Sequence, residues 1–205
     1  MVSKFYFLFF IIYSFVGFGL ANANSNNYQF SVITIGPNQN ELYSAFGHSG
    51  IRFKDDSLGL DYFYNYGIFD FDQPNFYLNF LNGNLLYMVG RFDFNQAKKH
   101  YLSENRYVKE QVLNLTASQK NKFLAYLENN LKDENKFYIY NYVYNNCATK
   151  IRDIIDVVLD NNIIYKENFS ELSIRNLMDL YLGQQEWGDL VIDICLGSEI
   201  DKKSN

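Results

Sequence analysis

The sequence predicts an α+β domain in which helices pack on a mostly antiparallel sheet. Segments with strand-like alternation and segments with helical spacing interleave along the chain, without the regular strand–helix rhythm that produces parallel sheets. The length of 205 residues suits one domain with a substantial core. Aromatic residues make up 19% of the chain, which excludes a coiled coil and a disordered segment.

The N-terminus has the features of a secretory signal peptide. Lys4 precedes an uncharged run over residues 5–20, and Ala21 and Ala23 are small residues at the positions that signal peptidase reads. The run is short for a membrane-spanning helix, which needs about 20 apolar residues. We therefore predict a signal peptide over residues 1–23 and a single exported domain over residues 24–205.

The first half of the domain predicts strands joined by short helices and turns. Aromatic and β-branched residues, bounded by glycine, proline or polar turns, predict strands over residues 28–35, 48–53, 60–66 and 85–92. Helical spacing and stop signals predict helices over residues 39–46, 74–81 and 95–105.

The second half of the domain is richer in helix. A long strand is predicted over residues 107–115, followed by a helix over residues 117–131 with Thr116 as its N-cap. The aromatic run 138–144 fits either a strand or a loop. A further helix opens at Cys147, and its apolar residues share one face: Ile151, Ile154, Ile155, Val158 and Leu159. The chain is expected to end with a helix over residues 171–182 and a strand over residues 190–195.

Charge and metal-ligand content exclude two classes of function. The net charge of −5 and the absence of a basic face argue against nucleic-acid binding. Two scattered histidines and no ligand spacing predict no metal site, and nothing indicates a cofactor. Cys147 and Cys195 permit one disulfide at most, so either they pair or at least one is a free, reactive thiol.

Cys147 is the candidate nucleophile. It stands directly before a helix, in the run Asn145-Asn146-Cys147-Ala148-Thr149. At a helix N-terminus, unpaired backbone N–H groups and the positive end of the helix dipole favour thiolate over thiol. The same N–H groups can form part of an oxyanion hole. The alternative is that Cys147 is a small buried hydrophobic residue.

His48 is the candidate base. It lies in Gly47-His48-Ser49-Gly50 at the start of a predicted strand, where a ligand can approach the backbone closely. The other histidine, His100, is expected on the surface of a lysine-rich helix. Ser49 is a poor nucleophile candidate for this base, because neighbouring residues of a strand point to opposite faces.

A third group is needed to orient the imidazole, and two residues compete for this role. Asp61 and Asn65 lie on the strand after His48 and are four positions apart, so they share a face. Either side chain could reach the ring, and turn chemistry at a strand end would explain both equally well.

Three runs of the sequence follow one another in a recognisable order. They are Gly47-His48-Ser49-Gly50-Ile51-Arg52, the segment from Asp61 to Phe71, and the segment from Asn145 to Asp153. Together they resemble the periplasmic domain of the Lnb-type lipoprotein N-acyltransferases, and residues 192–197 with Asp201 look like the end of that domain.

The resemblance implies a fold, a reaction and partners. The fold would be a circularly permuted papain-like domain of the NlpC and lecithin–retinol acyltransferase kind, with the His48 strand before the Cys147 helix. The family transfers a fatty acyl chain from a phospholipid to the N-terminal amine of a lipoprotein, at a membrane surface in the periplasm. Cys147 would carry the acyl group as a thioester, and His48 would take the thiol proton and then activate the amine.

Two other functions stay open at this point. Full-length members of that family continue into a membrane-embedded C-terminal part, whereas this sequence ends at Asn205, so a stand-alone cysteine hydrolase (peptidase or amidase) is an alternative. A non-catalytic module with a Cys147–Cys195 disulfide is another. One group of aromatic residues could form a membrane-facing route for the acyl chain, although we expect most of them in the core: Phe69, Phe71, Phe76, Tyr77 and Phe80.

Overall fold

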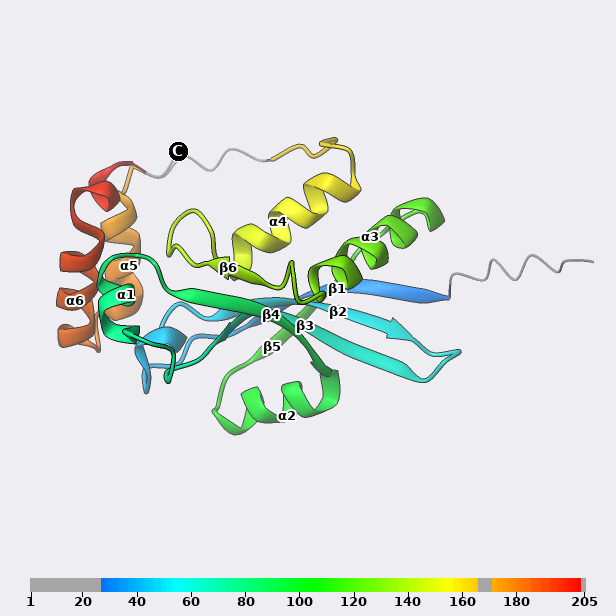
Figure 1. The fold of residues 1–205 in the computed structure, drawn as a ribbon, viewed down its shortest axis with the longest axis horizontal. Helices are drawn as coiled ribbons and strands as arrows, with labels where there is room; N and C mark the ends of the chain where they lie inside the picture. The colour runs from blue at the N-terminus through cyan, green and yellow to red at the C-terminus, as the bar shows by residue number, and fades with distance from the viewer. Residues whose placement is uncertain (1–26, 166–170, 204–205) are drawn as a thin grey trace, which may run out of the picture.

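A six-stranded antiparallel sheet lies at the centre of the computed structural model, in the strand order β5-β1-β2-β3-β4-β6 (Figure 1). The structure describes residues 27–165 and 171–203. Helices α3 and α4 cover one face of the sheet, and α2 covers the other. Helices α1, α5 and α6 gather at one end. The predicted antiparallel sheet with helices packed on it is confirmed, whereas the papain-like permutation stays a prediction.

The strands follow the alternating segments of the sequence closely. The predicted strand over residues 107–115 is five residues long in the structure, and the run 138–144 contributes only its start to a strand. Charged and polar side chains cover the short β5, as is usual for a strand at the edge of a sheet. The strands are β1 (Tyr28–Ile35), β2 (His48–Asp55), β3 (Leu60–Phe69), β4 (Leu86–Asp93), β5 (Val108–Val112) and β6 (Phe137–Ile139).

The helices also begin near their expected residues. Thr116 caps α3 as predicted, because its hydroxyl accepts a hydrogen bond from the Gln119 backbone N–H. The helix expected over residues 39–46 is only the 3₁₀ turn η1 (Leu42–Ser44). The α-helices are α1 (Phe76–Leu81), α2 (Phe94–Ser103), α3 (Ala117–Asn130), α4 (Cys147–Val158), α5 (Ile174–Leu182) and α6 (Glu186–Leu196), followed by the 3₁₀ helix η2 (Gly197–Asp201).

The predicted C-terminal strand over residues 190–195 is wrong, because this segment lies within α6. Ile192 is fully buried, and Leu196, one helical turn later, packs against the same cluster. A short apolar run has no periodicity that separates a strand from a helix, so only packing decides between them. Residues 190–195 pack against α5 and η1 and do not pair with a strand of the sheet.

The larger core lies between the sheet and the α3–α4 pair. The rings of Phe30 and Phe123 stack there with centroids 4.5 Å apart. Ile151, Ile154 and Val158 bury one face of α4 against the same cluster, as the helical spacing predicts. This burial fixes α4 on the sheet beside β2, and it brings the first residue of α4 to the end of β2 where His48 lies.

Part of the sequence prediction falls outside the described residues. The signal peptide over residues 1–23 and its cleavage site after Ala23 belong to this part. Within residues 27–165 and 171–203, no helix has the length and the apolar character that crossing a bilayer requires.

Removing the Phe123 ring tests the importance of the larger core. We expect Phe123→Ala to lower the free energy of unfolding by about 3–5 kcal/mol, because the ring is fully buried and its loss leaves a cavity. The matched control is Phe137→Ala on the edge strand β6, where the side chain is 50% exposed, and its cost should stay below about 1 kcal/mol. Urea unfolding of both variants is the measurement, and equal costs would contradict this assignment of the core.

Candidate active site

Cys147 is the first residue of α4, and Asn146 caps the helix. The Asn146 Oδ1 accepts hydrogen bonds from the backbone N–H groups of Ala148 and Thr149, both at 3.0 Å. The Asn146 N–H donates in return to the Thr149 hydroxyl at 2.8 Å, which completes a capping box. The helix start is therefore held rigidly around the thiol.

The loop before α4 is tied down by asparagine side chains. The Asn141 Oδ1 accepts from the backbone N–H groups of Val143 and Tyr144, at 2.9 and 2.8 Å. Asn145 donates from its side-chain amide to the Ile139 carbonyl at 2.6 Å. These bonds form a tight turn between β6 and α4, as expected of asparagine-rich turns. Asn146 thus caps α4, whereas Asn141 and Asn145 hold the turn before it.

His48 is the first residue of β2, where it pairs with Ile35 of β1. The preceding Gly47 has φ = 77°, and a Cβ there would lie 2.7 Å from the Ile35 carbonyl oxygen. Only glycine fits this position, since both the conformation and the close approach exclude a side chain. The turn that Gly47 permits places His48 at the sheet end facing α4.

The structure brings Cys147 and His48 to one pocket of about 240 Å³. Asn65, Tyr140 and Arg106 contribute to the same pocket. The backbone N–H of Ser49, the residue after His48, lies near enough to the Cys147 sulfur to lower the pKa of the thiol. The two candidate residues, 99 positions apart in sequence, are therefore neighbours in the fold.

Asn65 orients the imidazole. The His48 Nε2 lies 2.8 Å from the Asn65 Oδ1, and that same oxygen accepts the Gly67 backbone N–H at 2.7 Å. A backbone N–H can only donate, so the atom facing Gly67 must be the amide oxygen. The His48 Nε2 must then carry the proton in the neutral ring. This leaves the Nδ1 lone pair available to accept a proton.

Gly67 is a site residue that the sequence reasoning missed. A Cβ at this position would lie 2.6 Å from the His48 Cε1. The strand pairing of β3 with β4 shifts its register between Asn65 and Ile68, so Gly67 sits in an irregularity of the strand. An isolated glycine within a strand pattern indicates such a bulge or a close approach, and this signal could have identified it.

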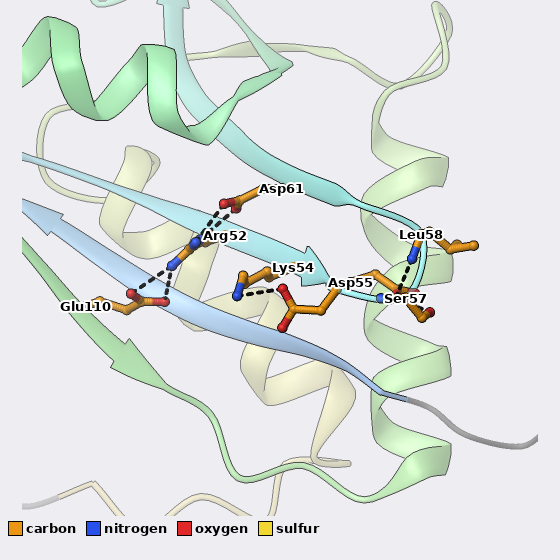
Figure 2. Close-up of polar contacts among 8 residues, drawn as sticks. Arg52, Lys54, Asp55, Ser57, Leu58, Asp61 and Glu110 are labelled. Carbon is orange, nitrogen blue, oxygen red and sulfur yellow. Dashed lines mark hydrogen bonds and ion pairs between the residues drawn. The ribbon is translucent and has the colours of Figure 1, made fainter.

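Asp61, the other candidate orienting group, contacts an arginine instead. Figure 2 shows the Asp61 carboxylate bound by the Arg52 guanidinium in a two-pronged ion pair, with both N–O distances 2.7 Å. Glu110 of β5 binds the same guanidinium at 2.9 and 3.0 Å. Asp61 and Asn65 do share a face of β3, but the four-residue offset places only Asn65 beside His48. Asp61 therefore belongs to an ion-pair network across the sheet.

Burial keeps the candidate pair neutral. It lowers the pKa of His48 to about 4, and the positive charge of Arg106 adds to this, although the Asn65 hydrogen bond opposes it. Burial also raises the pKa of the Cys147 thiol, and it outweighs the lowering by the N–H groups of Ser49, Ala148 and Cys147 itself. The expectation of a resting thiolate is therefore wrong: burial exceeds the helix N-terminal effect, and the Ala148 N–H already binds Asn146.

His100 and Cys195, the other histidine and cysteine of the chain, lie away from the centre of the candidate site. His100 is exposed and pairs with Glu104 at 3.3 Å, but it also reaches the rim of the Cys147 pocket. Cys147 and Cys195 are both free thiols, so the disulfide alternative is not realised in this structure. Cys195 lies on α6, whereas Cys147 begins α4.

One acidic group lies apart from the Cys147 pocket. Among the described residues, Asp179, Asp189 and Asp193 bring carboxylate oxygens within 4.8 Å of one another. Arg175 forms an ion pair with Asp193, so part of this negative charge is already balanced. No residue of the group lines the pocket that contains Cys147.

Comparison with known proteins gives one match. The family model described as the Lnb N-terminal periplasmic domain matches residues 15–179, which include His48, Asn65 and Cys147. No curated protein and no solved structure matches the chain.

The lowered pKa of His48 predicts an acid-sensitive contribution to stability. The folded protein holds His48 at a pKa of about 4, against the ordinary histidine value of 6.5, so it binds this proton less readily than the unfolded chain. The contribution is fully present above about pH 6.5 and is lost as the pH falls through 6.5 toward 4.

Urea unfolding of wild type and His48→Gln across this pH range measures the effect. Glutamine does not titrate, so the wild type should lose more stability than the variant on acidification. Parallel pH profiles for the two proteins would contradict a buried, neutral imidazole.

Proposed function

The chain belongs to the family of Lnb N-terminal periplasmic domains, and we propose that it is a thiol acyltransferase. Its domain is periplasmic. In the proposed reaction, Cys147 takes a fatty acyl group from a phospholipid and passes it to the N-terminal amine of a bacterial lipoprotein. The observation that carries this proposal is the shared pocket of Cys147 and the His48–Asn65 pair, which adjoins a large apolar cavity.

The first half-reaction forms a thioester. The His48 Nδ1 accepts the thiol proton while the Cys147 sulfur attacks the ester carbonyl carbon of the phospholipid. The backbone N–H of Cys147, at the start of α4, can donate to the oxyanion that develops. The C–O ester bond then breaks, and the imidazolium returns its proton to the leaving lysophospholipid oxygen.

The second half-reaction forms an amide. The incoming lipoprotein amine attacks the thioester carbonyl, and the His48 Nδ1 takes up the proton that the amine loses. The C–S bond breaks, and the proton passes to the Cys147 sulfur. Both half-reactions begin from a neutral imidazole and need no prior thiolate, in agreement with the lowered His48 pKa and the raised Cys147 pKa.

An apolar cavity of about 420 Å³ supports a fatty acyl substrate. Its volume lies within the range of about 300–1,000 Å³ that is typical of ligand pockets. It shares Tyr43, Phe69 and Tyr87 with the Cys147 pocket, so a chain attached at Cys147 can extend into it. Phe69, Phe71, Phe76 and Phe80 all line the cavity, and the Tyr77 side chain lies outside the described part of the structure. The expectation that most of this group is core is wrong for Phe69, Phe71 and Phe76, whereas Phe80 packs against the core cluster that contains Leu182 and Ile192.

The same cavity favours transfer over hydrolysis. An acyl chain that fills an apolar cavity beside the thioester displaces water from it, and this slows hydrolysis until an amine arrives. A peptidase would need a groove with hydrogen-bonding groups for an extended peptide instead. The hydrolase alternative remains distinguishable by experiment, because it requires water to be the better acceptor.

An exposed apolar end of the molecule supports action at a membrane surface. Helices α1, α5 and α6 lie together at this end (Figure 1), and several of their large apolar side chains are exposed to solvent. Trp187 is 81% and Ile194 is 69% exposed, and both lie on α6. Val191 of α6 lines the apolar cavity, so this end is continuous with the proposed acyl site. Exposed tryptophan and aliphatic groups of this kind suit the lipid–water interface.

The acyl-enzyme is the first test of the proposed function. Incubation of the protein with phospholipid vesicles should add the mass of one acyl group, which intact-protein mass spectrometry detects and which hydroxylamine removes. Cys147→Ala should abolish the adduct, whereas the matched control Cys195→Ser should retain it, because Cys195 lies on another helix. An adduct that survives Cys147→Ala, or none in any of the three proteins, would refute the proposal.

The acceptor separates a transferase from a hydrolase. A diacylglyceryl-cysteine peptide should discharge the adduct at least about tenfold faster than buffer alone and should yield an amide, since an acyl chain in the apolar cavity excludes water from the thioester. Discharge at the same rate with and without the peptide would favour the hydrolase.

Substitution at the apolar end tests the membrane surface. The double variant Trp187→Ser/Ile194→Ser should bind vesicles about tenfold more weakly than wild type. Burying the two apolar side chains in the membrane contributes more than about 1.4 kcal/mol of binding free energy, and the variant loses this contribution. The control is Leu58→Ser, which removes a 69% exposed leucine from the β2–β3 turn. Co-sedimentation with vesicles is the measurement, and an equal loss in both proteins would contradict this orientation.

A further inference from the structure

Arg106 is a buried cation in which one guanidinium nitrogen, Nη2, has no hydrogen-bond partner among the described residues. The residue is only 5% exposed and follows the turn after α2. Its Nε donates to the Gly36 carbonyl at 2.7 Å, and its Nη1 lies 3.3 Å from a Glu104 carboxylate oxygen. The Nη2 atom is itself buried.

An unpaired N–H on a buried guanidinium is costly. A buried donor without an acceptor loses its hydration and gains nothing in exchange, and the loss is larger for a charged group. Arg106 already supports the fold through Gly36 and stacks over the Tyr101 ring at 5.1 Å. These contacts explain the position of the side chain but leave the Nη2 without a function.

Arg106 lines the same pocket as the candidate nucleophile Cys147 and the candidate base His48. Glu104 is the one carboxylate among the pocket-lining residues, and it is shared between Arg106 and His100. The Glu104–Arg106 contact is long for a charge-assisted hydrogen bond, so the guanidinium keeps the capacity to bind a second anion.

We propose that Arg106 binds the phosphate diester of the phospholipid donor. This inference rests on the proposed acyl transfer and names the group that selects the donor. A phospholipid carries an anionic phosphate on one side of its ester and an acyl chain on the other. The site offers a guanidinium in the Cys147 pocket and an apolar cavity next to it, and a planar guanidinium fits phosphate oxygens well. Arg106 thus distinguishes a phospholipid from a neutral acyl ester.

Binding of a lipid headgroup without acyl chains tests the site independently of catalysis. The probe is glycerophosphoglycerol, which retains the phosphate diester, titrated into the full chain and followed by ³¹P NMR. We expect saturable binding that weakens at least about tenfold in Arg106→Gln, because a charge-assisted hydrogen bond is lost. Arg106→Lys keeps the positive charge but loses the planar, two-pronged donor geometry of the guanidinium, so this variant should bind the probe with intermediate strength.

The matched control for binding is Arg91→Gln, which removes an exposed arginine that pairs with Glu128 outside the pocket. Arg91→Gln should bind the probe as the wild type does. Unchanged binding in Arg106→Gln, or equal losses in Arg106→Gln and Arg91→Gln, would overturn the proposal. Competition by inorganic phosphate at concentrations no higher than those of the diester would also overturn it, since the site would then be one for free phosphate.

A donor comparison tests the same inference in the reaction. Thioester formation on Cys147 is measured with phosphatidylglycerol and with diacylglycerol of the same acyl chains. Arg106→Gln should slow the reaction with phosphatidylglycerol at least about tenfold more than the reaction with diacylglycerol. Equal losses with both donors would assign Arg106 a purely structural role.

The two measurements separate failure of this inference from failure of the proposed function. If neither donor acylates Cys147, the acyltransferase proposal fails, while Arg106-dependent binding of the diester would still establish the anion site. Thermal unfolding of each variant checks that it is folded. If Arg106→Gln does not fold, Arg106→Lys carries the comparison, and wild-type behaviour of this variant with both donors and with the probe would contradict the proposal.

Discussion

The packing of α4 on the sheet is the constraint on which the candidate site depends. Ile151, Ile154 and Val158 bury one side of the helix, so its position relative to β2 is fixed by the core. Cys147 is the first residue of that helix, and the Ser49 N–H of β2 lies near enough to its sulfur to lower the pKa of the thiol. The site therefore needs no flexible loop to assemble, because the helix start and the strand start meet as a consequence of core packing.

Burial determines the chemistry of the pair once packing has brought it together. Taking the imidazole out of water lowers its pKa, and taking the thiol out of water raises its pKa, so neither carries a charge at neutral pH. Asn65 supplies orientation without charge, because its amide oxygen is fixed by the Gly67 N–H and selects one tautomer of His48. A carboxylate in its place would stabilise the imidazolium, and the base would be less able to release its proton.

Local signals in the sequence identified most of this arrangement, and long-range contacts account for what they missed. The helix cap at Asn146, the isolated cysteine and the glycine-flanked His48 are all visible in a few neighbouring residues. Asp61 and Asn65 could not be separated, because alternation gives the face of a strand but not the distance along it. The helical state of residues 190–195 and the buried position of Arg106 depend on packing against distant segments, which no local pattern reveals.

The two halves of the pocket support the proposed preference for acyl transfer over hydrolysis. The polar half contains the thiol, the neutral base and the Arg106 guanidinium, whereas the apolar half contains no cation among its described lining residues. A substrate that is anionic at one end and apolar at the other fits both halves only when its ester lies near Cys147. In the proposed reaction, the acyl chain would then keep water from the thioester after the headgroup leaves. Selection of the donor and protection of the intermediate would both follow from the same division of the pocket.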